Sequence, residues 1–166
     1  MERNNAGIWV KRFGFASLLN GVIFLALSLA PLVPQWEVSR TMAGGSAGSW
    51  YVIGYLGLAI VGVLAVFLSG AAYYLFAQIS GGNIYNTKLA WLHLVLMDVG
   101  SVGTSLLLAW AGLNGAAMLR AEVPVPQVHV FLVQFEEPVA ALAVVAGLGA
   151  LAGIVNLAAT LASRTK

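Results

Sequence analysis

The stretch "VHVFLVQFEEP" at residues 128–138 places a histidine, a glutamine and two adjacent glutamates inside an otherwise apolar segment. The chain around it has 166 residues, of which 60% are hydrophobic and only 8% are charged, and its mean hydropathy is +0.90. Soluble domains carry about 25% charged residues. The composition therefore predicts an integral membrane protein, in which ionisable side chains within a span mark a functional or a partnered position.

Four segments of the chain are long and apolar enough to cross a bilayer, since a membrane-spanning helix needs about 20 residues. They are predicted at residues 13–34, 50–79, 89–113 and 126–162. The segments between them hold turn residues and most of the charges. We therefore expect residues 1–166 to form a single all-α domain, an integral membrane four-helix bundle.

The basic residues indicate the orientation of this bundle. One side carries Arg3, Lys11, Arg12, Lys88, Arg164 and Lys166, and the other carries only Arg40 and Arg120. The positive-inside rule then predicts a multi-pass protein of the cell membrane with both termini in the cytoplasm. A net charge of +2 gives no reason to expect nucleic acid as a partner. Because the chain has no cysteine, disulfides, iron–sulfur clusters and thiolate haem ligation by this chain are excluded.

The middle of the chain carries a pattern of polar and small residues. The second span ends in "SGAAYYLFAQISGG" (69–82), and the third contains "WLHLVLMDVGSVGTSLLLAWAGLNG" (91–115), in which the spaced positions are His93, Met97, Gly100, Thr104, Gly112, Leu113 and Gly115. Arg120, Pro124 and Pro126 follow. In these features residues 62–126 resemble the late helices and the next extracytoplasmic loop of the catalytic subunit of haem–copper oxygen reductases and nitric oxide reductases.

The haem and copper ligands of that family are missing from this chain. In that family, the helix that corresponds to the second span begins with two histidines that bind the haem irons. The corresponding place in this chain is "GYLG" at residues 54–57. The copper-binding histidines belong to other helices, and the first span has no histidine. Haem–copper oxygen reduction by this chain alone is therefore excluded, and no complete catalytic site is recognisable.

Two imidazoles, His93 and His129, are the candidate metal ligands. The resemblance implies a haem on the outer side of the membrane, with loop arginines at its propionates. We therefore expect His129 to be an axial ligand of haem b, with Arg120, Arg40 and Tyr55 beside it. One chain supplies only one ligand at that level, so a bis-histidine site needs a homodimer. The alternatives are interfacial anchoring for His129 and Arg120, and helix packing for His93.

Four polar residues are expected near the middle of the bilayer. Glu136 and Glu137 lie about 10 residues, or ~15 Å, into the fourth span, and Asp98 and Asn20 reach a similar depth in their spans. An ionised carboxylate there costs at least ~2.5–3.5 kcal/mol. We therefore expect protonated acids that hydrogen-bond to one another and to Asn20 or Gln134. A structural layer beside the kink at Pro138, proton transfer and cation binding all remain open.

These features together predict a small membrane b-type haem protein that acts in electron transfer or redox sensing. The alternatives are a cofactor-free accessory subunit of a respiratory membrane complex and a small proton or cation transport protein that uses the midplane carboxylates. The expected partners are the lipid bilayer, a second copy of the chain, and a respiratory-chain protein or quinone. Gly149 and Gly153 form a small-xxx-small pair that suits either a helix crossing within the bundle or a dimer contact.

Overall fold

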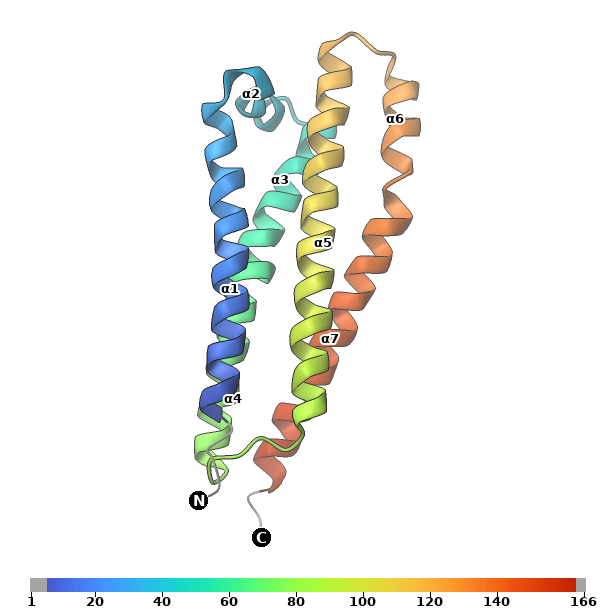
Figure 1. The fold of residues 1–166 in the computed structure, drawn as a ribbon. Coiled ribbons are helices and arrows are strands. Elements are labelled where there is room, and N and C mark those ends of the chain that lie inside the picture. Colours follow the sequence, from blue (N-terminus) through green and yellow to red (C-terminus); the bar gives the residue numbers. More distant parts are fainter. Residues whose placement is uncertain (1–5, 164–166) are drawn as a thin grey trace.

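The computed structural model describes residues 6–163, in which all the regular secondary structure is helical. Four helical segments are long and apolar enough to cross a membrane, namely Ala6–Leu32, Ala47–Ile79, Thr87–Arg120 and Val125–Ala162. They lie side by side as an elongated bundle, and the first and the last described residues lie at the same end of it (Figure 1). The prediction of an all-α, multi-pass membrane protein is confirmed. Arg3, Arg164 and Lys166, which contribute to the predicted orientation, lie outside the described residues.

The first span is helix α1 (Ala6–Leu29), which begins earlier than predicted and tightens into two 3-10 turns, Ala30–Leu32 and Pro34–Trp36. Proline lacks a backbone N–H, so a regular α-helix cannot continue unchanged through Pro31 and Pro34. The loop expected at residues 34–48 contains a short helix, α2 (Val38–Ala43). Glu37 precedes α2 in a left-handed conformation, with φ of 46°.

The second span changes its helix type in the middle. Helix α3 (Ala47–Gly57) passes into a π-helical segment, η3 (Leu58–Ala65), and then into α4 (Val66–Ile79). In a π-helix the hydrogen bonds run from i to i+5, and such turns are frequent at functional sites. Two carbonyl groups of this segment accept hydrogen bonds from α1 side chains, as described below.

The third span is helix α5 (Thr87–Arg120), which begins at an Asn86 cap whose Oδ1 accepts from the backbone N–H groups of Lys88 and Leu89. The loop predicted to start at residue 114 is wrong, because α5 continues to Arg120. Gly115 lies there against Ala47 and Leu132, so close packing extends past the predicted end. The helix stops before Glu122, whose φ is 57°, and Pro124.

The fourth span is broken into α6 (Val125–Val133) and α7 (Glu136–Ala162), with a visible bend between them (Figure 1). Pro138 cannot donate to the carbonyl of Gln134, so the regular ladder is interrupted there. The N–H of Phe135 instead donates to the carbonyl of Leu132 at 2.9 Å. The kink expected at Pro138 is therefore present, and it places both glutamates in the first turn of α7.

The bundle is held by two unequal sets of helix contacts. Helix α5 packs most extensively against α7 and α3, whereas α1 packs chiefly against α4 and η3 and touches α5 little. The larger core cluster surrounds Trp9, Phe13 and Tyr73, and a second cluster includes Val38 and Tyr51. In the most apolar stretch of the fourth span only 11% of the residues are buried, against 39% in the third. Most of the fourth span therefore faces outward.

Candidate functional site

Asp98 and Asn20 form a hydrogen-bonded pair within the bundle. The Nδ2 atom of Asn20 donates to Asp98 Oδ1 and to the carbonyl of Gly62, both at 2.7 Å. The hydroxyl of Ser17, one turn before Asn20, donates to the carbonyl of Val63 at 3.0 Å. Helix α1 is thereby tied to the π-helical segment and to α5 through polar contacts. The structure brings together these two members of the expected polar layer.

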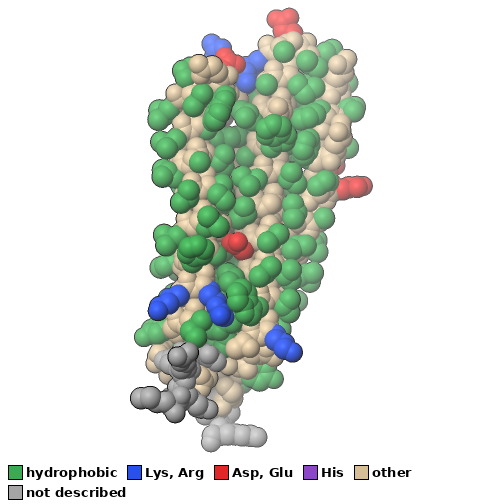
Figure 2. Space-filling view, viewed as in Figure 1, with side chains coloured by type: hydrophobic (Ala, Val, Ile, Leu, Met, Phe, Trp, Pro, Cys, Tyr) green, Lys and Arg blue, Asp and Glu red, His purple; other side chains and the backbone are tan. Residues whose placement is uncertain are grey.

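Glu136 and Glu137 lie elsewhere, with exposed side chains on the outside of α7. Gln134, an expected partner of these acids, instead donates to the carbonyl of Val130 in its own helix, at 3.3 Å. The expected polar layer is therefore divided into an internal pair between α1 and α5, in which Asn20 is buried and Asp98 is half-buried, and an external pair of glutamates. Figure 2 shows how few charged groups interrupt the hydrophobic surface between the two ends of the bundle.

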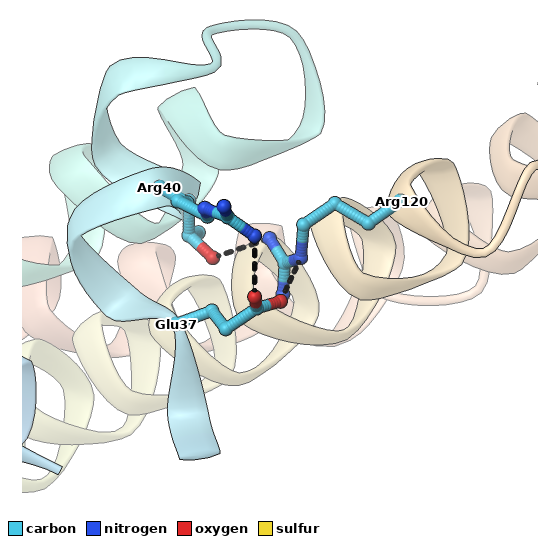
Figure 3. Close-up of polar contacts among 4 residues, drawn as sticks. Glu37, Arg40 and Arg120 are labelled. Carbon is cyan, nitrogen blue, oxygen red and sulfur yellow. Dashed lines mark hydrogen bonds and ion pairs between the residues drawn. The ribbon is translucent and has the colours of Figure 1, made fainter. Parts of the chain in front are cut away.

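Arg120 and Arg40, the expected haem-propionate partners, converge on one carboxylate (Figure 3). Glu37 Oε2 lies 2.7 Å from Arg120 Nε, and Glu37 Oε1 lies 2.8 Å from Arg40 Nη1. Arg120 also donates to Thr41 Oγ1 at 2.9 Å. This network fastens the loop after α1 to the end of α5. Sequence reasoning did not identify Glu37 or Thr41, although Glu37 and Arg40 have the i, i+3 spacing of a helical ion pair.

His129 and Tyr55 do not complete a haem pocket with these arginines inside one chain. The side chain of His129 is exposed on α6. The hydroxyl of Tyr55 lies 3.0 Å from Ser28 Oγ, and its ring packs against that of Phe24 in a tilted arrangement with a centroid separation of 4.9 Å. The residues of a single chain thus do not fit a haem, because the imidazole points outward and the arginines neutralise Glu37. A haem at His129 would need groups from a second chain.

His93 is a packing residue in the centre of the bundle. Its side chain is only 4% exposed, with Nδ1 at 3.3 Å from the Tyr73 hydroxyl and Nε2 at 3.2 Å from Met97 Sδ. A Cβ added at Gly153 would collide with the imidazole, so α7 closes directly over the ring. Within residues 6–163, no three His, Asp or Glu side chains gather as a metal site would require.

Asn156 extends this buried network to the loop between α4 and α5. It is fully buried, and its Nδ2 donates to the Tyr73 hydroxyl at 3.2 Å and to the Asn86 carbonyl at 2.8 Å. Its Oδ1 accepts from the Asn86 N–H at 2.9 Å, and Thr160 Oγ1 accepts from the Tyr85 N–H at 3.0 Å. Sequence reasoning missed both residues. Their i, i+4 spacing in the otherwise apolar stretch that follows Pro138 was the available signal.

Comparison of the chain with protein-family models, curated proteins and solved structures finds no match. The resemblance to haem–copper reductases stays a prediction.

Proposed function

We propose that this chain is a non-catalytic subunit of a larger membrane assembly, to which it binds through the fourth span. The exposed side chains of His129, Gln134, Glu136 and Glu137 are here called the polar surface of the fourth span. The observation that carries the proposal is the exposure of two adjacent carboxyl groups on the most outward-facing span of the bundle.

The depth of these carboxyl groups makes contact with lipid unfavourable. Glu136 lies 11 residues after Val125, where the span begins, and this corresponds to ~16 Å of helix rise. A charged side chain at the centre of a bilayer costs ~2.5–3.5 kcal/mol even on the more lenient insertion scale. The start of α7 lowers this cost only in part, through the positive end of the helix dipole. A partner helix that offers a lysine, arginine or amide at this level would satisfy both acids.

The assembly we propose is a respiratory one in the cell membrane, and two expectations support it. The resemblance of residues 62–126 to haem–copper and nitric oxide reductases points to that setting. The positive-inside rule would place the chain ends in the cytoplasm and Arg120 on the outer side. The partner would then be another multi-pass subunit that contacts α6 and α7 within the bilayer.

Photo-crosslinking tests the proposed contact in the native membrane. A photoreactive amino acid in place of Val133, which is 42% exposed beside the polar surface, should crosslink to one defined membrane polypeptide. The same photoreactive amino acid in place of Val22, which is 64% exposed on α1, is the matched control and should form no such crosslink. Substitution of Glu136 and Glu137 by alanine should reduce the crosslink and co-purification at least about tenfold, because the polar contacts are removed.

Glu122→Ala, in the loop before α6, is the charge control and should leave the complex intact. Equal crosslinking from both positions would contradict the proposal. Retention of the complex by the double alanine variant would also contradict it. The same holds if the wild-type protein is monomeric in gentle detergent and forms no crosslink.

A second candidate function, binding of haem b between two copies of the chain, is favoured by the exposure of His129. An imidazole on the outer surface of α6 is available to a site shared by two chains, in which His129 of each chain would hold the haem. When bound, the haem would supply one-electron chemistry, and the chain would supply the ligand and the apolar surroundings.

An absorption spectrum of the purified protein, oxidised and then reduced with dithionite, tests this second candidate. A Soret band and reduced b-type α and β bands are expected in the wild type and in Gln127→Ala, a neighbouring exposed position on α6. They should disappear in His129→Ala, because the imidazole that would hold the haem is lost. A preparation that stays colourless after reconstitution with haem rejects haem binding and leaves the subunit proposal standing.

A further inference from the structure

A groove of about 510 Å³ lies between α1 and α5, away from the fourth span. It exists because α1 packs against α4 and η3 and makes little contact with α5. Its wall is mainly apolar and includes Phe15, Leu94, Val95 and Val99. Lys11 and Arg12 line the same groove, so an apolar surface is joined to two positive charges.

Arg12 is held in place by two indole rings. Its guanidinium carbon lies 4.6 Å from the ring centroid of Trp9 and 4.6 Å from that of Trp91. Contacts with ring faces fix the guanidinium but leave its N–H groups available to an anion. Among residues 6–163, both ion pairs involve Glu37, at the other end of α1. The charges of Lys11 and Arg12 are therefore not neutralised by a described carboxylate.

The two cations lie at the level expected for lipid headgroups. Residues 13–32 follow them as an uncharged stretch to the end of the first span, and 20 helical residues correspond to ~30 Å, the thickness of the hydrocarbon core. Figure 2 shows basic side chains towards the lower end of the bundle, with a mainly hydrophobic surface and one acidic side chain above them. The groove thus runs from the headgroup level into the hydrocarbon.

The inner part of the groove reaches Asp98. The Oδ1 atom of this residue accepts from Asn20, which lies eight positions after Arg12 on α1, a rise of ~12 Å. This separation keeps the carboxyl group away from an anion bound at Lys11 and Arg12. The apolar wall lies between the two levels, where an acyl chain would pack.

We propose that this groove binds one anionic phospholipid, with its phosphate at Lys11 and Arg12 and an acyl chain against Phe15, Leu94, Val95 and Val99. The complementarity of charge selects this occupant. A zwitterionic phospholipid brings a cation of its own to the two basic side chains, so it gains less from them. The proposal concerns a different face from the fourth span and does not depend on the assembly proposed there.

Native mass spectrometry of the full chain in detergent micelles tests the proposal with equimolar phosphatidylglycerol and phosphatidylcholine of identical acyl chains. The wild type should retain one phosphatidylglycerol in preference to phosphatidylcholine. Lys11→Gln should reduce this preference about fivefold, since each basic side chain near the surface contributes roughly that factor. Lys11→Gln/Arg12→Gln should abolish the preference. Lys88→Gln, which removes an exposed cation outside the groove, should keep it.

A second pair of variants tests whether the acyl chain occupies the groove. Val95→Trp fills the groove from a position that is 46% exposed, and it should prevent retention of the lipid. Leu92→Trp is the matched control, 48% exposed on the same helix but outside the groove, and it should retain the lipid. Equal retention of the two lipids by the wild type would overturn the proposal. It would also fail if Lys88→Gln lost the preference as fully as the double variant, or if Val95→Trp retained the lipid.

Discussion

Substitution of Gly149 by valine is expected to destabilise the bundle by about 3 kcal/mol or more, which is the upper end of the range for overpacked cores. Gly149 lies where α7 crosses α5. A Cβ at this position would come within 2.9 Å of the Leu96 carbonyl carbon and would collide with the backbone nitrogen of Met97. Since these atoms belong to a helix backbone, side-chain rotation cannot relieve the contact, and the two helices must separate.

Gly147→Val is the matched control for this prediction. Gly147 lies two residues earlier in α7, and a Cβ there would meet nothing within 4 Å. Both variants replace glycine by valine, so the small difference in helix propensity affects them equally. The difference in stability between them therefore reports the steric cost of a side chain at the helix crossing. Thermal unfolding in one detergent, followed by tryptophan fluorescence, should show a large loss for Gly149→Val and little change for Gly147→Val. Equal melting temperatures would show that the crossing tolerates a side chain.

Gly149 and Gly153 illustrate which part of the fold could be predicted from the sequence. Hydropathy and length identify the four spans, and the small-xxx-small spacing correctly indicated a close helix approach. The spacing alone left open whether that approach is within one chain or between two copies. The structure places Gly149 against Met97 and Gly153 against His93, so both glycines serve the crossing within the bundle.

The candidate site was less predictable, because depth in the membrane does not determine the direction in which a side chain points. Asp98, Asn20 and Glu136 were all expected near the bilayer centre, yet Asp98 contacts Asn20 while Glu136 lies outside. The helix breaks at Gln134–Phe135, and this break changes the direction of the fourth span. A prediction that treats the span as one regular helix therefore places the side chains after the break on the wrong face. Likewise, Arg120 forms an ion pair with Glu37. The two residues are far apart in the sequence, so no local sequence pattern indicates this pair.

The internal pair gives the second large expected effect. Asn20→Leu removes both hydrogen bonds that Nδ2 donates, one to the Gly62 carbonyl and one to Asp98 Oδ1. An unsatisfied buried polar group costs about 1–3 kcal/mol, whereas single interhelical bonds in membranes average only about 0.6 kcal/mol. For the two bonds together we expect a loss of about 2 kcal/mol, measured as a shift of the unfolding midpoint in mixed micelles of SDS.

Two companion variants separate the role of Asp98 from that of Asn20. Asp98→Asn preserves an acceptor oxygen for Asn20 and removes the possibility of charge, so it should unfold at nearly the wild-type midpoint if the pair acts as a neutral hydrogen bond. Asn20→Leu/Asp98→Leu replaces both partners by apolar groups and should recover part of the loss, since the stranded acid is gone. Asn114→Leu is the control, because the amide of Asn114 donates to the Trp110 carbonyl of its own helix. A loss in Asp98→Asn as large as in Asn20→Leu would instead show that the stability of the bundle depends on the carboxyl group itself.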